Sequence, residues 1–78
     1  MSKLEWRNWR TEPLVCEAKP EPDTEYHVTI ADDGKIRGQR LLNWRQVWVS
    51  DEAKSYEEAK VMCQSHWDET FAEREAQS

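Results

Sequence analysis

Hydrophobic and polar residues alternate most regularly in the first half of the chain, where single polar residues separate Tyr26, Val28 and Ile30. A period of two is typical of a β-strand with one buried face. The strand is followed by Asp33 and Gly34, a residue pair that favours a tight hairpin turn. We therefore expect a hairpin whose first strand packs its three apolar residues into the core.

A second strand is predicted over residues 44–50, which read WRQVWVS. Alternation places Trp44 and Trp48 on one face with Gln46 and leaves apolar groups on the other face as well. Such a strand is covered on both sides, or it presents one apolar face to a partner. Between the turn and this strand, Gly38 and its successors predict a bulge, a break or a loop.

Residues 3–10 carry two tryptophans, each followed by an arginine. Their aromatic content favours a strand over a helix. In a strand, successive side chains point to opposite faces. Trp6 would then lie in the core with Leu4, and Trp9 would lie on the opposite, more exposed face beside Arg7.

The segment 11–23 holds all three prolines of the chain. Proline fixes φ, lacks the amide hydrogen and pushes the preceding residue towards an extended conformation. We therefore expect an irregular connector here. Only Leu14, Val15 and Cys16 would touch the core, as a short edge segment.

A helix is predicted near the C-terminus. Ser55 and Glu58 have the spacing of a capping box immediately before an apolar periodic run. The run forms an amphipathic stripe at a spacing of four, made of Ala59, Cys63, Trp67 and Phe71. The last residues are expected to fray.

Together these patterns predict one domain, residues 1–78, of the α+β class. A small antiparallel sheet of about three strands would carry one C-terminal amphipathic helix packed across it. The predicted elements are a strand at 3–10, a connector at 11–23, hairpin strands at 24–50, a helix at 56–73 and a frayed tail at 74–78.

The net charge of the 78-residue chain is −5, but the charges are unevenly distributed. Residues 35–45 carry Lys35, Arg37, Arg40 and Arg45 and no acid, whereas the flanking segments are acidic. General binding to nucleic acid needs neutralisation of phosphates, which an acidic protein with one short basic stripe does poorly. The acidic surface suits a basic protein partner better, and it also keeps a small protein soluble.

The sequence also indicates a cellular compartment. No apolar run approaches the ~20 residues that span a bilayer, and the N-terminal residues lack the apolar region of a secretory signal. We therefore expect no membrane contact and a cytoplasmic location. In that compartment Cys16 and Cys63 are expected as reduced thiols.

Residues able to carry out chemistry are few in this sequence. Cys63 and His66 have half of a zinc-site spacing, but the remaining soft ligands, Cys16 and His27, lack the close spacing of a second pair. Cys63 lies on the predicted apolar stripe, where a buried thiol behaves as a small hydrophobic group. A triad of Cys63, His66 and Asp68 would need a pocket and an oxyanion site, for which so small a domain has little room. We expect no metal, no cofactor and no enzymatic activity.

Binding to a protein is the function that the residues favour. Tryptophan and arginine are enriched at the energetic centres of protein interfaces, and five tryptophans exceed what one layer of sheet and helix needs. The predicted contact surface consists of Trp9, Arg10, Arg40, Trp44 and Arg45. An acidic helix face that mimics nucleic-acid phosphates is a second candidate surface. Its charges would be Glu57, Glu58, Asp68, Glu69 and Glu73.

Two alternatives remain open. A small RNA- or DNA-binding regulator would use the basic segment 35–45, because arginine beside tryptophan can stack on bases and bind phosphates. However, a tryptophan and the following arginine point to opposite faces of a strand, so a core tryptophan leaves an outward arginine for a purely structural reason. The other alternative is a homodimeric accessory protein in which Trp44 or Trp48 packs against its symmetry mate. The chain is thus expected as a monomer or a homodimer.

The order of elements also carries a resemblance. A tryptophan-bearing N-terminal segment, a Tyr-x-Val strand, a tryptophan-bearing strand and a terminal SYEEAK helix follow one another over residues 4–72. In size, acidity and element order the chain resembles small phage and prophage anti-defence proteins, among them anti-CRISPR proteins. The resemblance implies a non-enzymatic inhibitor that binds a bacterial protein or nucleoprotein complex in the host cytoplasm. It carries over no site residues.

Overall fold

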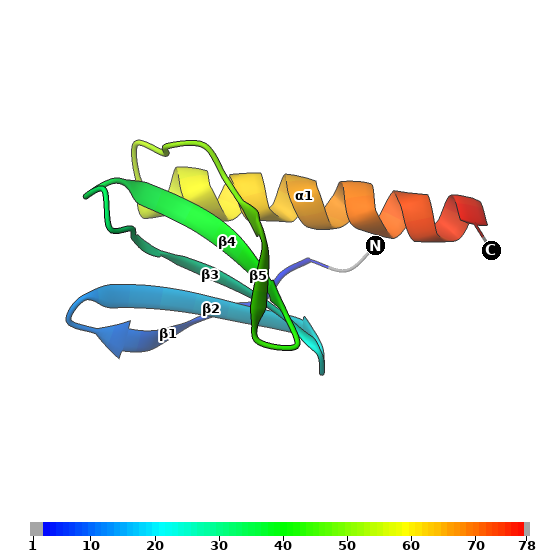
Figure 1. Ribbon diagram of the computed structural model, residues 1–78, viewed down its shortest axis with the longest axis horizontal. Coiled ribbons are helices and arrows are strands. Elements are labelled where there is room, and N and C mark those ends of the chain that lie inside the picture. The colour runs from blue at the N-terminus through cyan, green and yellow to red at the C-terminus, as the bar shows by residue number, and fades with distance from the viewer. Residues whose placement is uncertain (1–2, 78) are drawn as a thin grey trace.

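The computed structural model describes residues 3–77 of the chain, and side chains for residues 3–70. In this part the chain forms strands β1 (Trp6–Thr11), β2 (Leu14–Glu21), β3 (Thr24–Ile30), β4 (Ile36–Leu42) and β5 (Arg45–Val49), followed by helix α1 (Tyr56–Gln77). All neighbouring strands are antiparallel and lie in sequence order. Helix α1 lies across one side of the sheet (Figure 1). The α+β class is confirmed, but the described sheet has five strands rather than about three.

The segment 11–23 is the main difference from the predicted architecture. It contains the whole of β2, an eight-residue strand between β1 and β3, so the expectation of an irregular connector is wrong. Pro13 lies in the turn that joins β1 to β2, after a cis peptide bond. Pro20 lies beyond Ala18, where the ladder to β3 shifts register and the pairing with β1 has ended. A missing amide hydrogen costs little at such a position, which is why the strand tolerates its proline.

The core lies between α1 and the side of the sheet that α1 covers, which we call the helix face. Its centre is Tyr26, which is fully buried and meets Trp67 edge-on at 6.3 Å between ring centroids. The predicted helix stripe is confirmed as far as it is described; Phe71 lies outside the described side chains. The buried cluster consists of Leu4, Cys16, Ala18, Tyr26, Val28, Ala53, Ala59, Cys63 and Trp67.

Gly38 lies inside β4, so the break predicted at this residue is absent from the described strand. A Cβ atom added there would lie 2.4 Å from Sγ of Cys63 and 3.3 Å from the carbonyl oxygen of Ala59. Glycine therefore allows α1 to approach the sheet closely. The amide of Gly38 donates a 2.8 Å hydrogen bond to Oγ of Ser50, which holds the end of β5 against β4.

A bulge does occur within the stretch predicted to contain a bulge, a break or a loop, since the ladder between β4 and β5 shifts register between Arg40 and Leu41. Arg40 pairs with Trp48 and Leu41 pairs with Gln46, so Val47 is the extra residue. The bulge reverses the alternation along β5. Trp48 consequently lies on the helix face and Gln46 on the opposite one, which corrects the prediction that they share a face.

The alternation predicted for the N-terminal strand agrees with the structure. Trp6 is half-buried and packs against the helix-face core, whereas Trp9 is 52% exposed. A register shift between Asn8 and Arg10 makes Trp9 the unpaired residue. Ile30, in contrast, is 48% exposed and was wrongly expected in the core, because the helix-face cluster does not reach the last residue of β3.

Helix α1 begins with the predicted cap. Oγ of Ser55 accepts a 3.1 Å hydrogen bond from the amide of Glu58, whose Oε1 in turn faces the amide of Lys54 at 3.4 Å. The helix continues to Gln77 rather than ending at residue 73, because the final residues are good helix formers. Its C-terminal part extends past the sheet (Figure 1). Within residues 3–77, no helix is long and apolar enough to cross a membrane.

Candidate functional site

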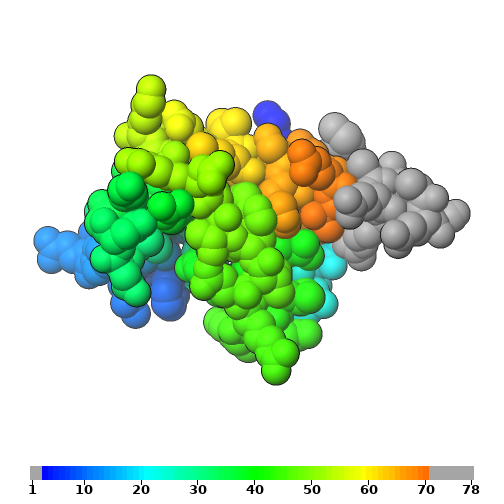
Figure 2. Space-filling view, turned by 45° about the horizontal axis from the view of Figure 1, so that its top comes forward, coloured from blue at the N-terminus to red at the C-terminus, as the bar shows by residue number. Residues whose placement is uncertain are grey.

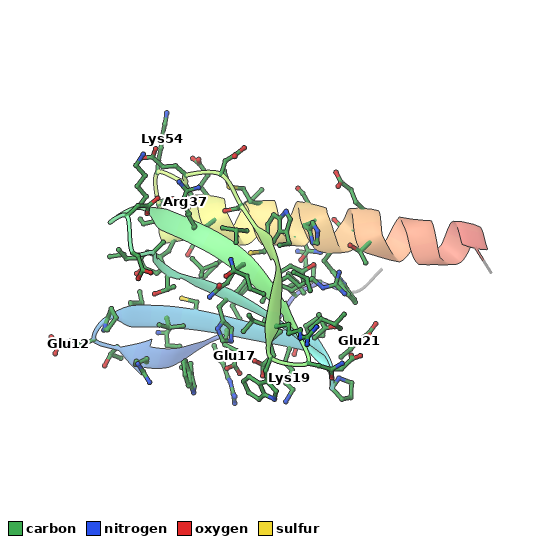
Figure 3. The ribbon with its side chains drawn as sticks, viewed as in Figure 1. Glu12, Glu17, Lys19, Glu21, Arg37 and Lys54 are labelled. Carbon is green, nitrogen blue, oxygen red and sulfur yellow. The ribbon has the colours of Figure 1, made fainter. Side chains whose placement is uncertain are left out.

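The side of the sheet that faces away from α1 carries the candidate site, and we call it the open face. Because side chains alternate along a strand, the neighbours of the core residues in β2 and β3 point to this side. Figure 3 shows Glu17 and Lys19 projecting from β2 away from α1. The central residues of this face are Glu17, Lys19, Glu25, His27, Gln39 and Leu41.

Three ionisable side chains meet at the centre of the open face. Glu17 lies directly opposite His27 in the ladder between β2 and β3, and Glu25 precedes His27 by two residues on the same side of β3. Nε2 of His27 lies 3.7 Å from Oε2 of Glu17 and 3.3 Å from Oε2 of Glu25. The exposed fractions of the three residues are only 6%, 8% and 8%. Burial of two carboxylates around an imidazole is uncommon on the uncovered side of a sheet.

The outer oxygen of each carboxylate has a basic partner. Nε and Nη2 of Arg7 donate to Oε1 of Glu17 at 3.1 Å and 2.7 Å. Nζ of Lys19 lies 3.8 Å from Oε1 of Glu25. The Oε2 oxygens are thereby left facing the imidazole. These cations offset part of the charge that burial of the two carboxylates would otherwise leave uncompensated.

Trp9 forms one margin of this cluster. The Trp9 ring lies 5.8 Å from the His27 ring and is tilted by 31° to it. The guanidinium of Arg10 lies 4.8 Å from the centroid of the Trp9 ring. Trp9 thus covers His27 with one part of the indole while about half of the side chain remains exposed.

Trp44 forms the other margin, at the tip of the β4–β5 hairpin. Asn43 and Trp44 have φ values of 51° and 69°, as both central residues of a type I′ turn do. The side chain of Trp44 is 81% exposed, and it lines a hollow of about 40 Å³ with Glu25 and Leu41. Figure 2 shows the hairpin, in green, projecting from the body of the molecule.

A larger hollow adjoins the cluster on the open face. It has a volume of about 460 Å³ and is lined in part by Thr29, Gln39, Gln46 and Val49. Gln39 lies directly opposite His27 in the ladder between β3 and β4, so one residue that lines the hollow is a neighbour of the cluster. The lining also includes Asp32, Asp33 and Arg37, so the hollow combines apolar, amide and charged groups.

The structure separates the residues predicted for the contact surface. Trp9, Arg10 and Trp44 lie around the open face, as described above. Arg40 pairs with Tyr26 and with Trp48 and therefore belongs to the helix face. Arg45 pairs with Leu42, two residues further along that same face. The structure therefore does not bring the five predicted residues together on one face of the sheet, because Arg40 and Arg45 lie on the side opposite Trp9.

On the helix face, Arg40 has a buried nitrogen and lies close to Tyr26. Its Nε is buried, and no group in the described part of the chain forms a hydrogen bond with it. Burial raises the pKa of Tyr26 to about 12, although the positive charge of Arg40 acts to lower this pKa. The Tyr26 hydroxyl therefore stays protonated, and it shares a 2.8 Å hydrogen bond with Nδ1 of His66.

The basic segment 35–45 does not form a continuous basic surface. Nζ of Lys35 lies 3.4 Å from Oε2 of Glu52. Arg37 donates to Asp33 and to the carbonyl of Ser50. These cations are engaged in local contacts at the end of β4 that lies far from Trp44.

The predicted acidic face of α1 is only partly uniform. Glu57 and Asp68 lie about three turns apart on one line of the helix, and Glu58 and Glu69 follow a parallel line. Lys60 interrupts them, with Nζ 3.3 Å from Oε1 of Glu57. The fifth predicted charge, Glu73, lies outside the described side chains.

The cysteines and His66 do not form the sulfur-containing site weighed from the sequence. Burial raises the pKa of the Cys63 thiol to about 12, so it lacks the thiolate that a nucleophile or metal ligand needs. The thiol of Cys16 points to Asn8 at 3.5 Å. His66 bonds to Tyr26 and stacks on Trp48 at 4.2 Å on the helix side, whereas His27 lies across the sheet.

The sequence-based interpretation did not single out Glu17 and Glu25, and it considered His27 only together with Cys16, Cys63 and His66. The spacing Glu25-x-His27 was visible, because alternate residues of a strand share a face. Glu17 was not predictable in this role, since β2 was expected to be a connector. Comparison of the chain with protein-family models, with curated proteins and with solved structures found no match.

Proposed function

We propose that this chain is a non-enzymatic module that binds another protein through its open face, with Trp9 and Trp44 as the anchoring side chains. One observation carries the proposal: these two tryptophans are 52% and 81% exposed and border the same buried cluster. Tryptophan buries a large area on binding and is enriched among residues that dominate binding energy.

The backbone of Trp44 adds support. Position two of a type I′ turn favours glycine, because φ is positive there. A bulky residue in this conformation costs on the order of 1–3 kcal/mol. The fold gains little from an indole that is 81% exposed. A strained and exposed tryptophan is better explained by contact with a partner than by stability.

A protein fits this surface better than nucleic acid does. The centre of the open face holds two carboxylates, Glu17 and Glu25, which would repel phosphates. The chain carries a net charge of −5, and its basic segment is divided between local ion pairs and the helix face. Contacts between basic side chains and phosphates dominate the affinity of proteins for nucleic acid, and the open face offers few basic side chains for such contacts.

A narrower form of the proposal concerns the partner. The resemblance to small phage anti-defence proteins suggests an inhibitor of a bacterial defence or nucleic-acid-handling complex in the host cytoplasm. This part rests on size, acidity and element order alone. A contact surface rimmed by indoles and centred on carboxylates suits a partner that presents apolar side chains beside basic ones.

Affinity capture from a nuclease-treated bacterial lysate tests the proposal. The wild type and a Val61→Ala control are expected to retain the same stoichiometric protein, because Val61 is an exposed apolar residue on α1, away from the open face. The Trp9→Ala/Trp44→Ala double variant should bind it at least about tenfold more weakly.

Three outcomes would contradict the proposal: no stoichiometric protein on the wild type, equal retention by the double variant, or capture that depends on nucleic acid. Sedimentation velocity of the wild type at rising concentration separates the alternative of a homodimer through Trp44. In that case the Trp44→Ala variant would remain monomeric where the wild type associates.

A further inference from the structure

The cluster of Glu17, Glu25 and His27 has a feature that protein binding does not explain. Nε2 of His27 is buried, and within residues 3–70 no group forms a hydrogen bond with it. Carboxylate oxygens of Glu25 and Glu17 lie 3.3 Å and 3.7 Å from this nitrogen, yet neither accepts a hydrogen bond from it. A buried polar atom without a partner is costly and calls for an explanation.

We propose that Glu17, Glu25 and His27 bind a divalent transition-metal ion, with Zn²⁺ as the ion that fits best. Zinc binds imidazole nitrogen and carboxylate oxygen at about 2.0–2.2 Å in a tetrahedron, which separates neighbouring ligand atoms by about 3.4 Å. The two nitrogen–oxygen distances of 3.3 Å and 3.7 Å match this separation. One ligand atom from each of the three residues lies within 4.8 Å of the others, so small side-chain rotations complete the site.

The surroundings have the form of an outer shell. Arg7 donates to Oε1 of Glu17 and Nζ of Lys19 lies 3.8 Å from Oε1 of Glu25, so the Oε2 oxygens are the ones that face His27 and are available to an ion. The Trp9 ring, 5.8 Å from the imidazole, shields one side from water. Outer contacts of this kind orient ligands and maintain affinity. Three protein ligands leave the fourth tetrahedral position to water or to a ligand from another molecule.

The ligand set selects the class of ion. Mg²⁺ and Ca²⁺ prefer sites made of oxygen alone, with six or more ligands. Cu⁺ prefers sulfur, and the thiols of Cys16 and Cys63 belong to the helix-face core. One imidazole with two carboxylates suits Zn²⁺ and its neighbours in the first transition series.

Titration of the chelator-stripped wild-type chain with ZnCl₂ in a calorimeter tests the site. One equivalent of Zn²⁺ is expected to bind saturably, and the bound ion should raise the melting temperature, because a ligand that binds the folded state stabilises it. His27→Gln and Glu25→Gln should each weaken Zn²⁺ binding at least about tenfold. His66→Gln is the matched control: it removes the chain's other histidine, which lies on the helix side, and should leave binding unchanged.

Nuclear magnetic resonance of the imidazole nitrogens gives a readout that needs no variant. Addition of ZnCl₂ to the wild type should move the Nε2 signal of His27 and leave the His66 signals in place. The proposal is overturned if the wild type takes up no stoichiometric Zn²⁺, if folded His27→Gln binds it as well as the wild type, or if the His66 signals respond instead.

Discussion

The two faces of the sheet differ in the kind of side chain that they bury. On the helix face, alternate residues of β2 and β3 are small or apolar and pack densely under α1, with Tyr26 and Val28 fully buried. On the open face, their immediate neighbours are Glu17, Glu25 and His27, which are buried although α1 lies on the other side of the sheet. Each pair of neighbours differs by one position in the chain, so a one-residue shift in register would exchange the two faces.

The comparison distinguishes residues whose burial stabilises the fold from residues whose placement the stability of the fold does not explain. Removal of apolar area from water accounts for the residues of the helix face. No such gain accounts for exposed indoles and for carboxylates placed around an imidazole. Both proposals above concern the open face for this reason, and the tests below compare the two faces directly.

The largest expected difference is between two tryptophans. Trp67→Ala should lower the free energy of unfolding by about 3–5 kcal/mol, because it empties a site that is 2% exposed beside Tyr26. Trp44→Ala should change it by less than about 0.5 kcal/mol, because the side chain is 81% exposed. Urea unfolding followed by circular dichroism measures both. Equal losses for the two variants would contradict the assignment of the faces.

The next effect tests how closely α1 approaches the sheet. Gly38→Ala should destabilise the protein by about 1–3 kcal/mol, because its new methyl group would lie 2.4 Å from Sγ of Cys63. The double variant Gly38→Ala/Cys63→Ala should recover part of that loss, since the clashing sulfur is removed. Additive losses in a thermal-denaturation cycle would show that the contact is not as close as described.

A smaller effect of opposite sign is expected on the open face. Trp44→Gly should stabilise the protein by about 0.5–1 kcal/mol, because glycine adopts the φ of 69° without strain. The melting temperature should rise by about 4 °C. The same variant should lose binding to the captured partner. A lower melting temperature for Trp44→Gly would instead give the indole a structural role.

The smallest effect concerns the turn between β3 and β4. The pKa of Asp33 is lowered from 3.8 by the Lys35 amide and then by the Arg37 side chain. A lowered pKa means that ionised Asp33 stabilises the fold above pH 3.8, and that this contribution is lost as the pH falls through the folded-state pKa. Asp33→Asn should therefore melt slightly below the wild type at pH 7 and together with it well below pH 3.8. A difference that persists in acid would mean that the carboxylate charge is not responsible.

Part of the fold follows from local patterns in the sequence. The β3 strand, the turn at Gly34 with its φ of 80°, and the cap of α1 at Ser55 all appear where expected. The opposite placement of Trp6 and Trp9 also follows from alternation alone. These features depend on a few consecutive residues, whose periodicity and hydrogen-bonding capacity are fixed by the backbone geometry.

Other parts were decided only by tertiary structure. The prolines of segment 11–23 led to the wrong prediction of a connector in place of β2. The energetic cost of a proline in a strand depends on whether a neighbouring strand needs the missing amide hydrogen, which local sequence does not reveal. The role of Gly38 within β4 depends on α1, a helix distant in sequence that packs where a Cβ atom would otherwise lie. The bulge at Val47 turns Trp48 inward, and the pairing of β2 with β3 places Glu17 opposite His27. Register and close approach arise from the packing of whole elements, so no short stretch of sequence encodes them, and the cluster on the open face exists only because those elements meet.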